Sequence, residues 1–373
     1  MAEITFALTQ EQQMLKETTR QFLEDHVDSK VVRDLMEKPD GYDRELWKAG
    51  AELGWHSLAI PEEYGGVGFG FTETSIVIEE LGRSLFPGPF LSTVVMATHA
   101  ILLAGSEQQK QEFLPDVAAG ERIMTMALFE GPHGTDPNDI MMRATATDEG
   151  WVLDGLKRYV AYGNVADTLI VAARTESGVS LFLVPGDAAG LRVGVVPTLD
   201  ATRRETDVSF DHVVAGGLLG TEGSAGPVIE RVLLLANVAL AVEQVGGTQW
   251  CLETAVEYAK TRFQFGRAIG SFQAIKHRCA DMLVAVEHGK SAAHWAARNA
   301  DDEAETRIAS PMAKAVCSDA YVGAAGETIQ ILGGTGFTWE HDVHLYLKRA
   351  KSTSLMFGGV RHQRRLLAKA LGF

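Results

Sequence analysis

The amino-acid sequence predicts an α+β protein built from three parts, because its hydrophobic pattern changes character twice. Apolar residues recur at helical spacing in residues 1–122, and short β-branched and aromatic runs separated by turn residues occupy residues 123–222. Helical spacing then returns in residues 223–373. We therefore expect an N-terminal helical domain, a middle antiparallel β-barrel or sandwich, and a C-terminal helical bundle.

The first part begins with a helix whose expected N-cap is Thr9, with Glu11 in the first turn. A loop rich in proline and glycine at residues 61–68 interrupts the helical pattern. Further helices are expected at 72–83, at 93–103 and from the N-cap Ser106 to Pro115.

Strands are expected in the middle part, where turn residues recur about every ten positions. The expected strands are residues 150–154, 168–172, 179–184 and 206–210. The last part is expected to form five helices, at residues 226–242, 249–258, 272–298, 309–332 and 355–371.

Composition excludes several classes of function. The net charge of −15 disfavours nucleic acid, which binds concentrated lysine and arginine. Three widely spaced cysteines, Cys251, Cys279 and Cys317, form neither a disulfide framework nor a zinc motif. The N-terminus lacks the pattern of a signal peptide, and no run of 18 apolar residues predicts a membrane span. We expect a cytoplasmic protein.

Motifs in the first and last parts resemble the acyl-CoA dehydrogenase family. Residues 60–68 (IPEEYGGVG), 79–83 (EELGR) and 105–110 (GSEQQK) are similar to the family's N-terminal signature. Residues 258–266 (YAKTRFQFG) with 272–275 (FQAI) resemble a second signature, and residues 330–336 (QILGGTG) a third. The motifs occur in family order along nearly the whole chain. The resemblance implies that family's fold, with a C-terminal four-helix bundle, and FAD bound where subunits of an oligomer meet.

The resemblance assigns the ADP half of a neighbouring subunit's FAD to residues of the last part. A guanidinium such as that of Arg262 suits a pyrophosphate, and Phe265 offers a flat face for an adenine ring. Glycine backbone can approach a bulky ligand closely. The expected ADP-side residues are Arg262, Phe265, Gln273, Gln330, Gly333 and Gly334.

The flavin-side motifs depart from the family. The loop at residues 129–136 (FEGPHGTD) keeps a hydroxyl at Thr135, for phosphate or pantetheine, but has Phe129 where the family has a hydroxyl residue. The strand at residues 157–163 (KRYVAYG) keeps an aromatic wall at Tyr159, while Ala161 lacks the hydroxyl that would bond near flavin N5. Flavin binding by the chain's own β part therefore stays open.

The catalytic base of the family is also missing from its usual places. Gly358 stands where most members carry a glutamate, and Ala236 stands where a branched-chain subgroup carries it. The remaining candidate is Glu243, seven residues further along the same helix face. Two other roles for Glu243 stay open, which are an ion pair with a buried partner such as Arg262 or Arg278 and recognition of a polar group in the acyl pocket.

The arginine that binds CoA phosphate in the family aligns with Asn237, and Arg231 lies six residues earlier. We expect both positions to contact the acyl-CoA substrate. A basic cluster near the C-terminus is a further, weaker candidate for a phosphate contact. It consists of Arg361, His362, Arg364 and Arg365.

Three functions follow from this pattern. The first is FAD-dependent α,β-dehydrogenation of an acyl-CoA to a trans-2-enoyl-CoA, with electrons passed to an electron-transfer flavoprotein. The second is a subunit of an α2β2 acyl-CoA dehydrogenase that contributes to the FAD site without supplying the base, with steroid side-chain thioesters as the substrate by analogy. The third is a flavin-free scaffold, and a flavin oxidase or monooxygenase on the same fold is a further option.

Overall fold

The computed structural model describes residues 8–131 and 134–373, and the chain forms two compact units. The bundle unit comprises Met1–Val32, Phe71–Phe86 and Asn237–Phe373. The β unit comprises Arg33–Gly70 and Pro87–Ala236. The three domain boundaries expected from the sequence remain a prediction.

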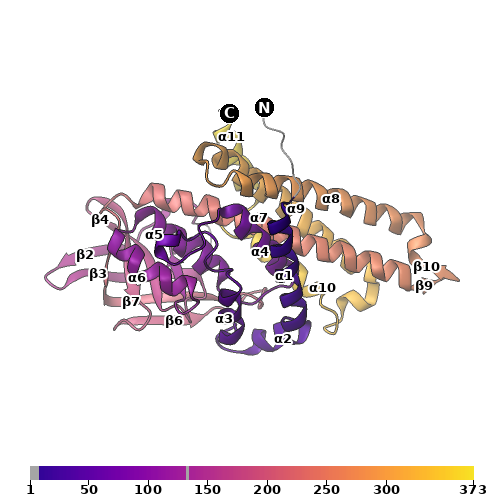
Figure 1. Cartoon of the computed structure of the whole chain (residues 1–373), viewed down its shortest axis with the longest axis horizontal. Coiled ribbons are helices and arrows are strands. Elements are labelled where there is room, and N and C mark those ends of the chain that lie inside the picture. Colours follow the sequence, from indigo (N-terminus) through magenta and orange to yellow (C-terminus); the bar gives the residue numbers. More distant parts are fainter. Residues whose placement is uncertain (1–7, 132–133) are drawn as a thin grey trace. The chain divides into compact units, whose positions relative to one another are not determined.

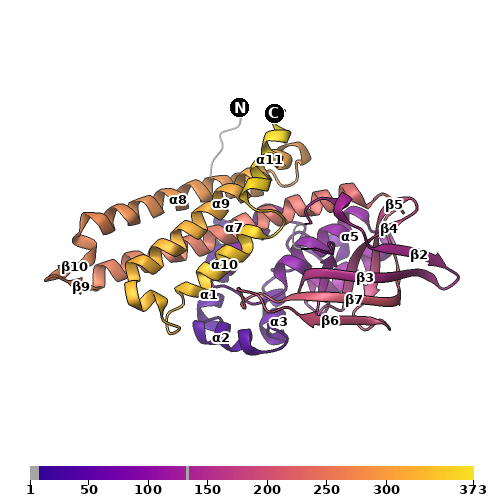
Figure 2. The ribbon, with the colours of Figure 1, turned by 180° about the vertical axis from the view of Figure 1, so that it is seen from behind.

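Helices make up almost all of the bundle unit. α8 packs along α9, α10 and α11 pack on α9, and α4 packs against both α1 and α8 (Figures 1 and 2). The helices are α1 (Gln10–His26), α4 (Phe71–Arg83), α7 (Ala225–Thr261), α8 (Gln273–Arg298), α9 (Glu303–Leu332), α10 (Val343–Leu355) and α11 (Val360–Ala370). The part of α7 before Asn237 belongs to the β unit. Between them lie the hairpin of β9 (Phe263–Gln264) and β10 (Arg267–Ala268), and the short turns η4 (Ile269–Ser271) and η5 (Gly333–Phe337).

α7 is one helix of 37 residues, so the prediction of two helices at 226–242 and 249–258 is wrong. Gly246 and Gly247 lie inside this helix. Glycine is required at both positions because neighbouring helices approach the α7 backbone too closely for a Cβ. A Cβ on Gly246 would lie 1.9 Å from the carbonyl oxygen of Glu79 on α4, and a Cβ on Gly247 would lie 2.3 Å from the ring of Tyr321 on α9. The glycines are therefore sites of close helix packing rather than helix ends.

Among the described helices, only α7 is long and apolar enough to cross a membrane by length and composition. Two-thirds (67%) of its most apolar stretch is buried inside the protein. Core helices of globular units have the same property, since a helix that is hydrophobic on all sides is one that is surrounded.

Charged residues of α4 are paired inside the bundle unit. Lys16 Nζ and His294 Nε2 each lie 2.7 Å from carboxylate oxygens of Glu79, which is almost fully buried. Burial alone would raise the pKa of Glu79, but the bonds and charges of His294 and Lys16 outweigh it and lower that pKa to about 2. Arg20 binds both oxygens of Glu80 at 2.8–2.9 Å. The EELGR motif therefore ties α1, α4 and α8 together.

Two expected features at the ends of helices are confirmed and one is wrong. Thr9 and Ser106 both cap their helices in reciprocal capping boxes, with Gln12 and Gln109. The helix expected over 355–371 begins only at Val360, because the turn before it contains left-handed backbone. The helix α10 that precedes this turn was not predicted.

The β unit combines short helices with one sheet. Its helical elements are most of α2 (Ser29–Glu37), α3 (Arg44–Glu52), η1 (Glu62–Tyr64), the π-helical η2 (Leu91–Ala97), α5 (Thr98–Ala104), α6 (Glu107–Ala118) and η3 (Pro137–Asp139). Its strands are β1 (Met124–Ala127), β2 (Arg143–Thr147), β3 (Gly150–Ala161), β4 (Thr168–Thr175), β5 (Gly178–Pro185), β6 (Leu191–Val195), β7 (Glu205–Val214) and β8 (Gly217–Leu219).

The sheet has the strand order β6-β7-β3-β2-β4-β5-β8, with β1 paired to β4. Neighbours are antiparallel, except that β1 and the end of β2 run parallel to β4. All four strands expected from the sequence are confirmed, within β3, β4, β5 and β7. The fold class expected from the sequence is therefore the one observed.

Candidate functional site

One end of the bundle unit carries the β9–β10 hairpin that links α7 to α8 (Figure 1). Arg262 stands at the start of the hairpin, is exposed, and makes no ion pair with any described residue. Phe265 at the tip is 91% exposed and has a φ of +53°, in the left-handed region that bulky side chains rarely adopt. An exposed aromatic side chain on a left-handed backbone is a feature typical of sites that contact another molecule.

The end of α9 and the turn η5 lie at the same end of the bundle. Gln330 is exposed on the last turn of α9, and a Cβ on Gly333 or Gly334 would meet nothing within 4 Å. Arg278 on α8 forms an ion pair with Glu327 on α9, which brings the first turns of α8 beside the last turns of α9.

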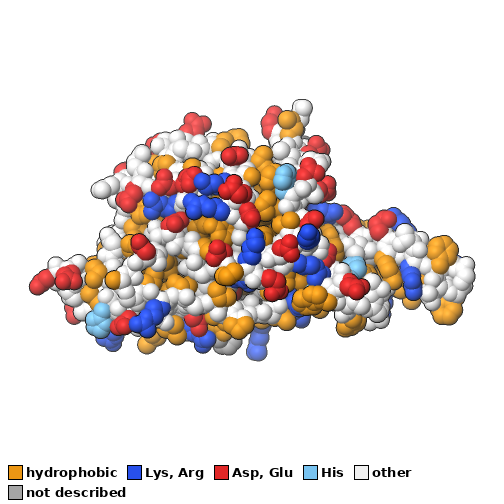
Figure 3. All heavy atoms as spheres, turned by 90° about the horizontal axis from the view of Figure 1, so that it is seen from below, with side chains coloured by type: hydrophobic (Ala, Val, Ile, Leu, Met, Phe, Trp, Pro, Cys, Tyr) orange, Lys and Arg blue, Asp and Glu red, His pale blue; other side chains and the backbone are white. Residues whose placement is uncertain are grey.

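Tyr258 near the end of α7 lies at the same place, since it packs against the buried cluster of Ile329, Leu332 and Val343. The structure therefore brings the six expected ADP-side residues to one end of the bundle. In the space-filling view, hydrophobic side chains gather at that end, on the right (Figure 3). The most exposed ring-bearing residues there are Phe263, Phe265, Phe337 and Trp339.

The flavin-side motifs of the β unit are fastened to each other. Lys157, fully buried on β3, donates from Nζ to Glu130 Oε1 at 2.6 Å and to the Leu128 carbonyl at 2.7 Å. Glu130 also accepts from the backbone N–H of Met142 at 2.9 Å. Burial outweighs the ion pair and lowers the pKa of Lys157 to about 8. The loop after β1 is thus anchored to β3 by an ion pair whose lysine is buried and whose glutamate is partly exposed.

Tyr159 and Phe129 have opposite environments in this part of the β unit. The pairing of β3 with β7 shifts register between Lys157 and Val160, and Tyr159 in this bulge has a φ of +55° and is 41% exposed. Phe129 is buried, and a Cβ on Gly134 would collide with its ring at 2.4 Å. An aromatic wall at Tyr159 agrees with this geometry, whereas the Phe129 side chain is enclosed by its own loop.

For two further flavin-side residues, Thr135 and Ala161, the structure shows hydrogen bonds of the backbone only. Thr135 is half-buried and its backbone N–H donates to Asp139 at 3.3 Å. Ala161 is half-buried at the end of β3, and its carbonyl accepts from Thr125 Oγ1 at 2.7 Å. Pro132 and His133 of the same expected loop lie outside the described residues.

Glu243 does have a buried partner, but it is neither Arg262 nor Arg278. Its Oε1 lies 2.9 Å from Nη1 of Arg349 on α10, and both side chains are almost fully buried. The expectation named the wrong arginines because sequence spacing does not tell which helix packs beside α7. Arg262 is exposed on the hairpin, and Arg278 is paired with Glu327.

A buried polar cluster surrounds this ion pair where α7, α9 and α10 meet. Gln244 Nε2 donates to Ser318 and Thr353 hydroxyls, each at 3.1 Å. Lys314, fully buried, donates from Nζ to the Thr353 carbonyl at 2.7 Å and lies within 4 Å of no carboxylate among the described residues. Burial lowers the pKa of Lys314 to about 7, although the charge of Glu243 opposes the shift. Sequence reasoning missed Lys314 and Arg349. The only signal for Lys314 was a charge inside an apolar helical stretch, and Arg349, which follows Lys348, had none.

The expected substrate contacts on α7 differ from each other. Asn237 is buried and its Oδ1 has no hydrogen-bond partner among the residues that the structure describes, so an N–H donor of a ligand would satisfy it. Arg231 is half-buried. In the C-terminal basic cluster, Arg364 pairs with Asp319 at 2.8 Å on the surface.

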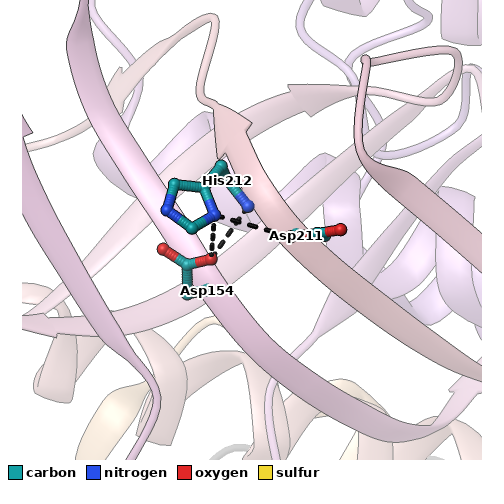
Figure 4. Close-up of side chains that lie close together, drawn as sticks. All are labelled: Asp154, Asp211 and His212. Carbon is teal, nitrogen blue, oxygen red and sulfur yellow. Dashed lines mark hydrogen bonds and ion pairs between the residues drawn. The ribbon is translucent and has the colours of Figure 1, made fainter.

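Three exposed side chains that sequence reasoning did not select lie together on the sheet. His212 Nδ1 lies 3.1 Å from Asp154 Oδ1 and 3.5 Å from Asp211 Oδ1 (Figure 4). The backbone N–H of His212, whose φ is +52°, donates to Asp154 at 2.8 Å, opposite a register shift in β3. These contacts fasten a β-bulge, and all three residues are solvent-exposed.

Comparison with protein families identifies the family of this chain. The N-terminal domain of acyl-CoA dehydrogenase matches residues 9–121, the middle domain matches residues 125–213, and the C-terminal domain matches residues 226–372. The chain belongs to the acyl-CoA dehydrogenase family.

Relatives within the family cover nearly the whole chain. The acyl-CoA dehydrogenase IpdE2 of Mycolicibacterium smegmatis is 33% identical over 96% of this chain and 98% of its own length. The butyryl-CoA dehydrogenase structure from Megasphaera elsdenii has a TM-score of 0.92 and 28% identity, and covers 99% of this chain and 100% of that one. A chain of the ChsE4-ChsE5 complex from Mycobacterium tuberculosis has a TM-score of 0.89 and 30% identity, with 99% of each chain covered.

As an acyl-CoA dehydrogenase, the chain is a flavoprotein oxidoreductase whose cofactor is FAD. The residues at the hairpin end of the bundle fit the ADP half of this cofactor. Arg262 offers an unpaired guanidinium for phosphate, Gln273 and Gln330 offer exposed carboxamides, and Phe265 offers an exposed ring. The space that a Cβ would take at Gly333 and Gly334 is open to a ligand.

Proposed function

We propose that this chain is one subunit of an acyl-CoA dehydrogenase with two unlike chains, in which it holds the ADP half of FAD and a companion chain supplies the base. The assembly converts an acyl-CoA to a trans-2-enoyl-CoA. When bound, FAD would supply the acceptor for the hydride that leaves the β carbon of the thioester. Electrons then pass to an electron-transfer flavoprotein, and we expect the assembly to be cytoplasmic.

The Glu243–Arg349 ion pair is the observation that carries this proposal. A general base must bind a proton during the reaction. A guanidinium at 2.9 Å stabilises the ionised carboxylate, so protonation of Glu243 would cost the free energy of that contact. The other two positions at which the family carries its glutamate hold Ala236 and Gly358.

The contrast between the two halves of the cofactor site supports the same role. At the hairpin end of the bundle, the expected ADP-side residues other than glycine are exposed, and the space beside Gly333 and Gly334 is open. On the flavin side, Phe129 is enclosed by its own loop and Ala161 has no hydroxyl. This asymmetry is expected of a chain that completes a cofactor site belonging mainly to its companion.

The type of acyl group in the proposed substrate is inferred only from similarity to other proteins of the family. The chain is similar to a chain of the ChsE4-ChsE5 complex, whose name joins two different proteins. We infer a bulky acyl group, of the steroid side-chain type, because mixed assemblies of this family act on such thioesters. Asn237, with its unpartnered buried oxygen, and Arg231 and Thr135 are the residues we assign to the CoA moiety.

The experiment that tests the proposal measures the subunit and FAD composition of the purified complex. The chain is co-expressed with the products of neighbouring genes, and the purified complex is analysed for subunit mass, stoichiometry and FAD absorbance. We expect two kinds of chain in equal number. A homo-oligomer with one FAD per chain would overturn the proposal.

Two variants then separate the roles within the chain. Arg262→Met should lower the FAD content, whereas Lys260→Met, which removes an exposed charge two residues earlier, should not. Glu243→Gln should leave reduction of FAD by the substrate thioester within about threefold. A loss of reduction by a factor of 100 or more, the size expected for a general base, would restore Glu243 to the catalytic role.

A further inference from the structure

The turn between α10 and α11 has an unusual backbone (Figure 2). Phe357 has a φ of +53° and Gly358 a φ of +96°, so two consecutive residues occupy the left-handed half of conformational space. Gln363 on α11 is almost fully buried and donates from Nε2 to the carbonyls of Phe357 at 2.9 Å and Gly358 at 3.1 Å. One side chain therefore fixes the direction of both carbonyls in the turn.

His362 fills the space beside the same turn. A Cβ built on Gly358 would lie 2.4 Å from Cδ2 and 2.9 Å from Cγ of His362, both atoms of a rigid ring. A Cβ on Gly359, by contrast, would meet its nearest atoms at 3.8 Å, an ordinary contact distance. A side chain is therefore sterically excluded at position 358 but could be accommodated at the adjacent position 359.

We propose that His362 and Gln363 keep this turn closed to any side chain at position 358, so that a single substitution there cannot give the chain a base. The inference rests on the proposed function, in which the base comes from the companion chain. His362 acts by occupying volume, and Gln363 is a positioning residue that holds Phe357 and Gly358 in their left-handed conformations. The packing of α11, together with the identity of residue 358, therefore prevents this chain from supplying a base at position 358.

Exchange of hydrogen on acetyl-CoA tests this proposal without requiring oxidation. Acetyl-CoA has hydrogens on the α carbon but no β carbon, so a base can exchange them with deuterium from the solvent while no hydride can leave. Mass spectrometry follows the exchange with the complex as purified. We expect Gly358→Glu to leave the exchange rate within about twofold of the parent. A tenfold increase with an unchanged melting temperature would overturn the proposal.

The same exchange experiment distinguishes failure of the proposed function from failure of the closed-turn proposal. If the chain supplied its own base from Glu243, Glu243→Gln would abolish the exchange while Gly358 stayed unaltered. An increase caused by Gly358→Glu, with Glu243→Gln harmless, would contradict only the closed turn.

A double-mutant cycle keeps the proposal testable where Gly358→Glu does not fold. Gly358→Ala should lower the melting temperature by roughly 3 °C or more, while Gly359→Ala should change it by less than about 1 °C. Removing the ring with His362→Ala should recover part of the loss caused by Gly358→Ala, leaving only the backbone strain. Additive effects of the two substitutions would show that His362 does not block the turn.

Discussion

The backbone carbonyl of Glu79 on α4 and the Cα of Gly246 on α7 approach so closely that a Cβ on Gly246 would lie 1.9 Å from the carbonyl oxygen. The contact is reciprocal, because a Cβ on Gly82 of α4 would lie 2.2 Å from the carbonyl oxygen of Glu243 on α7. Two glycines, one on each helix, therefore set the distance between α4 and α7.

Gly246→Ala should destabilise the protein by roughly 3 kcal/mol or more, since backbone on both helices would have to move. Urea unfolding at pH 7 measures the change. Gly323→Ala on α9 is the matched control, because a Cβ there would meet nothing within 4 Å. The control should stabilise the helix by about 0.5–1 kcal/mol. Equal effects of the two substitutions would contradict the close approach.

Arg349→Met should cost about 3–5 kcal/mol of unfolding free energy, because it leaves the Glu243 carboxylate buried without its partner. The double variant Glu243→Leu with Arg349→Met removes both charges and should lie closer to the parent than either single variant. Denaturant unfolding of the three variants gives the coupling energy. A coupling near zero would show that the pair contributes nothing.

Stability should rise with pH on the alkaline side because of Lys314. Burial lowers the pKa of this amine to about 7 in the folded protein, against 10.5 as its ordinary value. Between these values the unfolded chain binds the proton and the folded chain does not, so unfolding free energy gains up to roughly 1.4 kcal/mol per pH unit.

Lys314→Met should flatten this alkaline slope, which unfolding measurements from pH 7 to pH 10 would detect. Lys290→Met, at a partly exposed lysine of α8, is the control and should leave the slope unchanged. A slope that survives Lys314→Met would assign the proton to another group.

Lys157→Met should destabilise the β unit by about 3 kcal/mol, because Glu130 would lose the ammonium that neutralises it inside the loop anchor. Glu130→Gln combined with Lys157→Met should recover part of the loss. Thermal unfolding followed by circular dichroism measures both. A fully tolerated Lys157→Met would mean that the loop is held without this pair.

Much of the fold could be predicted because local signals agreed with the final structure. The side chains of Thr9 and Ser106 satisfy backbone groups only a few residues away, so both caps were visible in the sequence. The four predicted strands lie in the long strands β3, β4, β5 and β7, of 8 to 12 residues, whereas the missed strands β1, β2, β6 and β8 have only 3 to 5 residues.

Errors arose where contacts between distant segments decide the structure. Gly246 and Gly247 look like a helix break until α4 and Tyr321 are in place against them. Glu243 and Arg349 are 106 residues apart, and nothing in either neighbourhood indicates that α10 lies beside α7. The ADP-side residues could be chosen only from their motifs, since exposure at one end of the bundle is a property of the packed helices.

The two adjacent glycines of α7 also limit how this helix can change in evolution. Each residue of a helix turns by about 100°, so one inserted or deleted residue before Gly246 would rotate everything upstream relative to the contacts with α4 and α9. Changes of length in α7 can therefore be accommodated only near its first and last turns, whereas substitutions along its length that preserve size remain open.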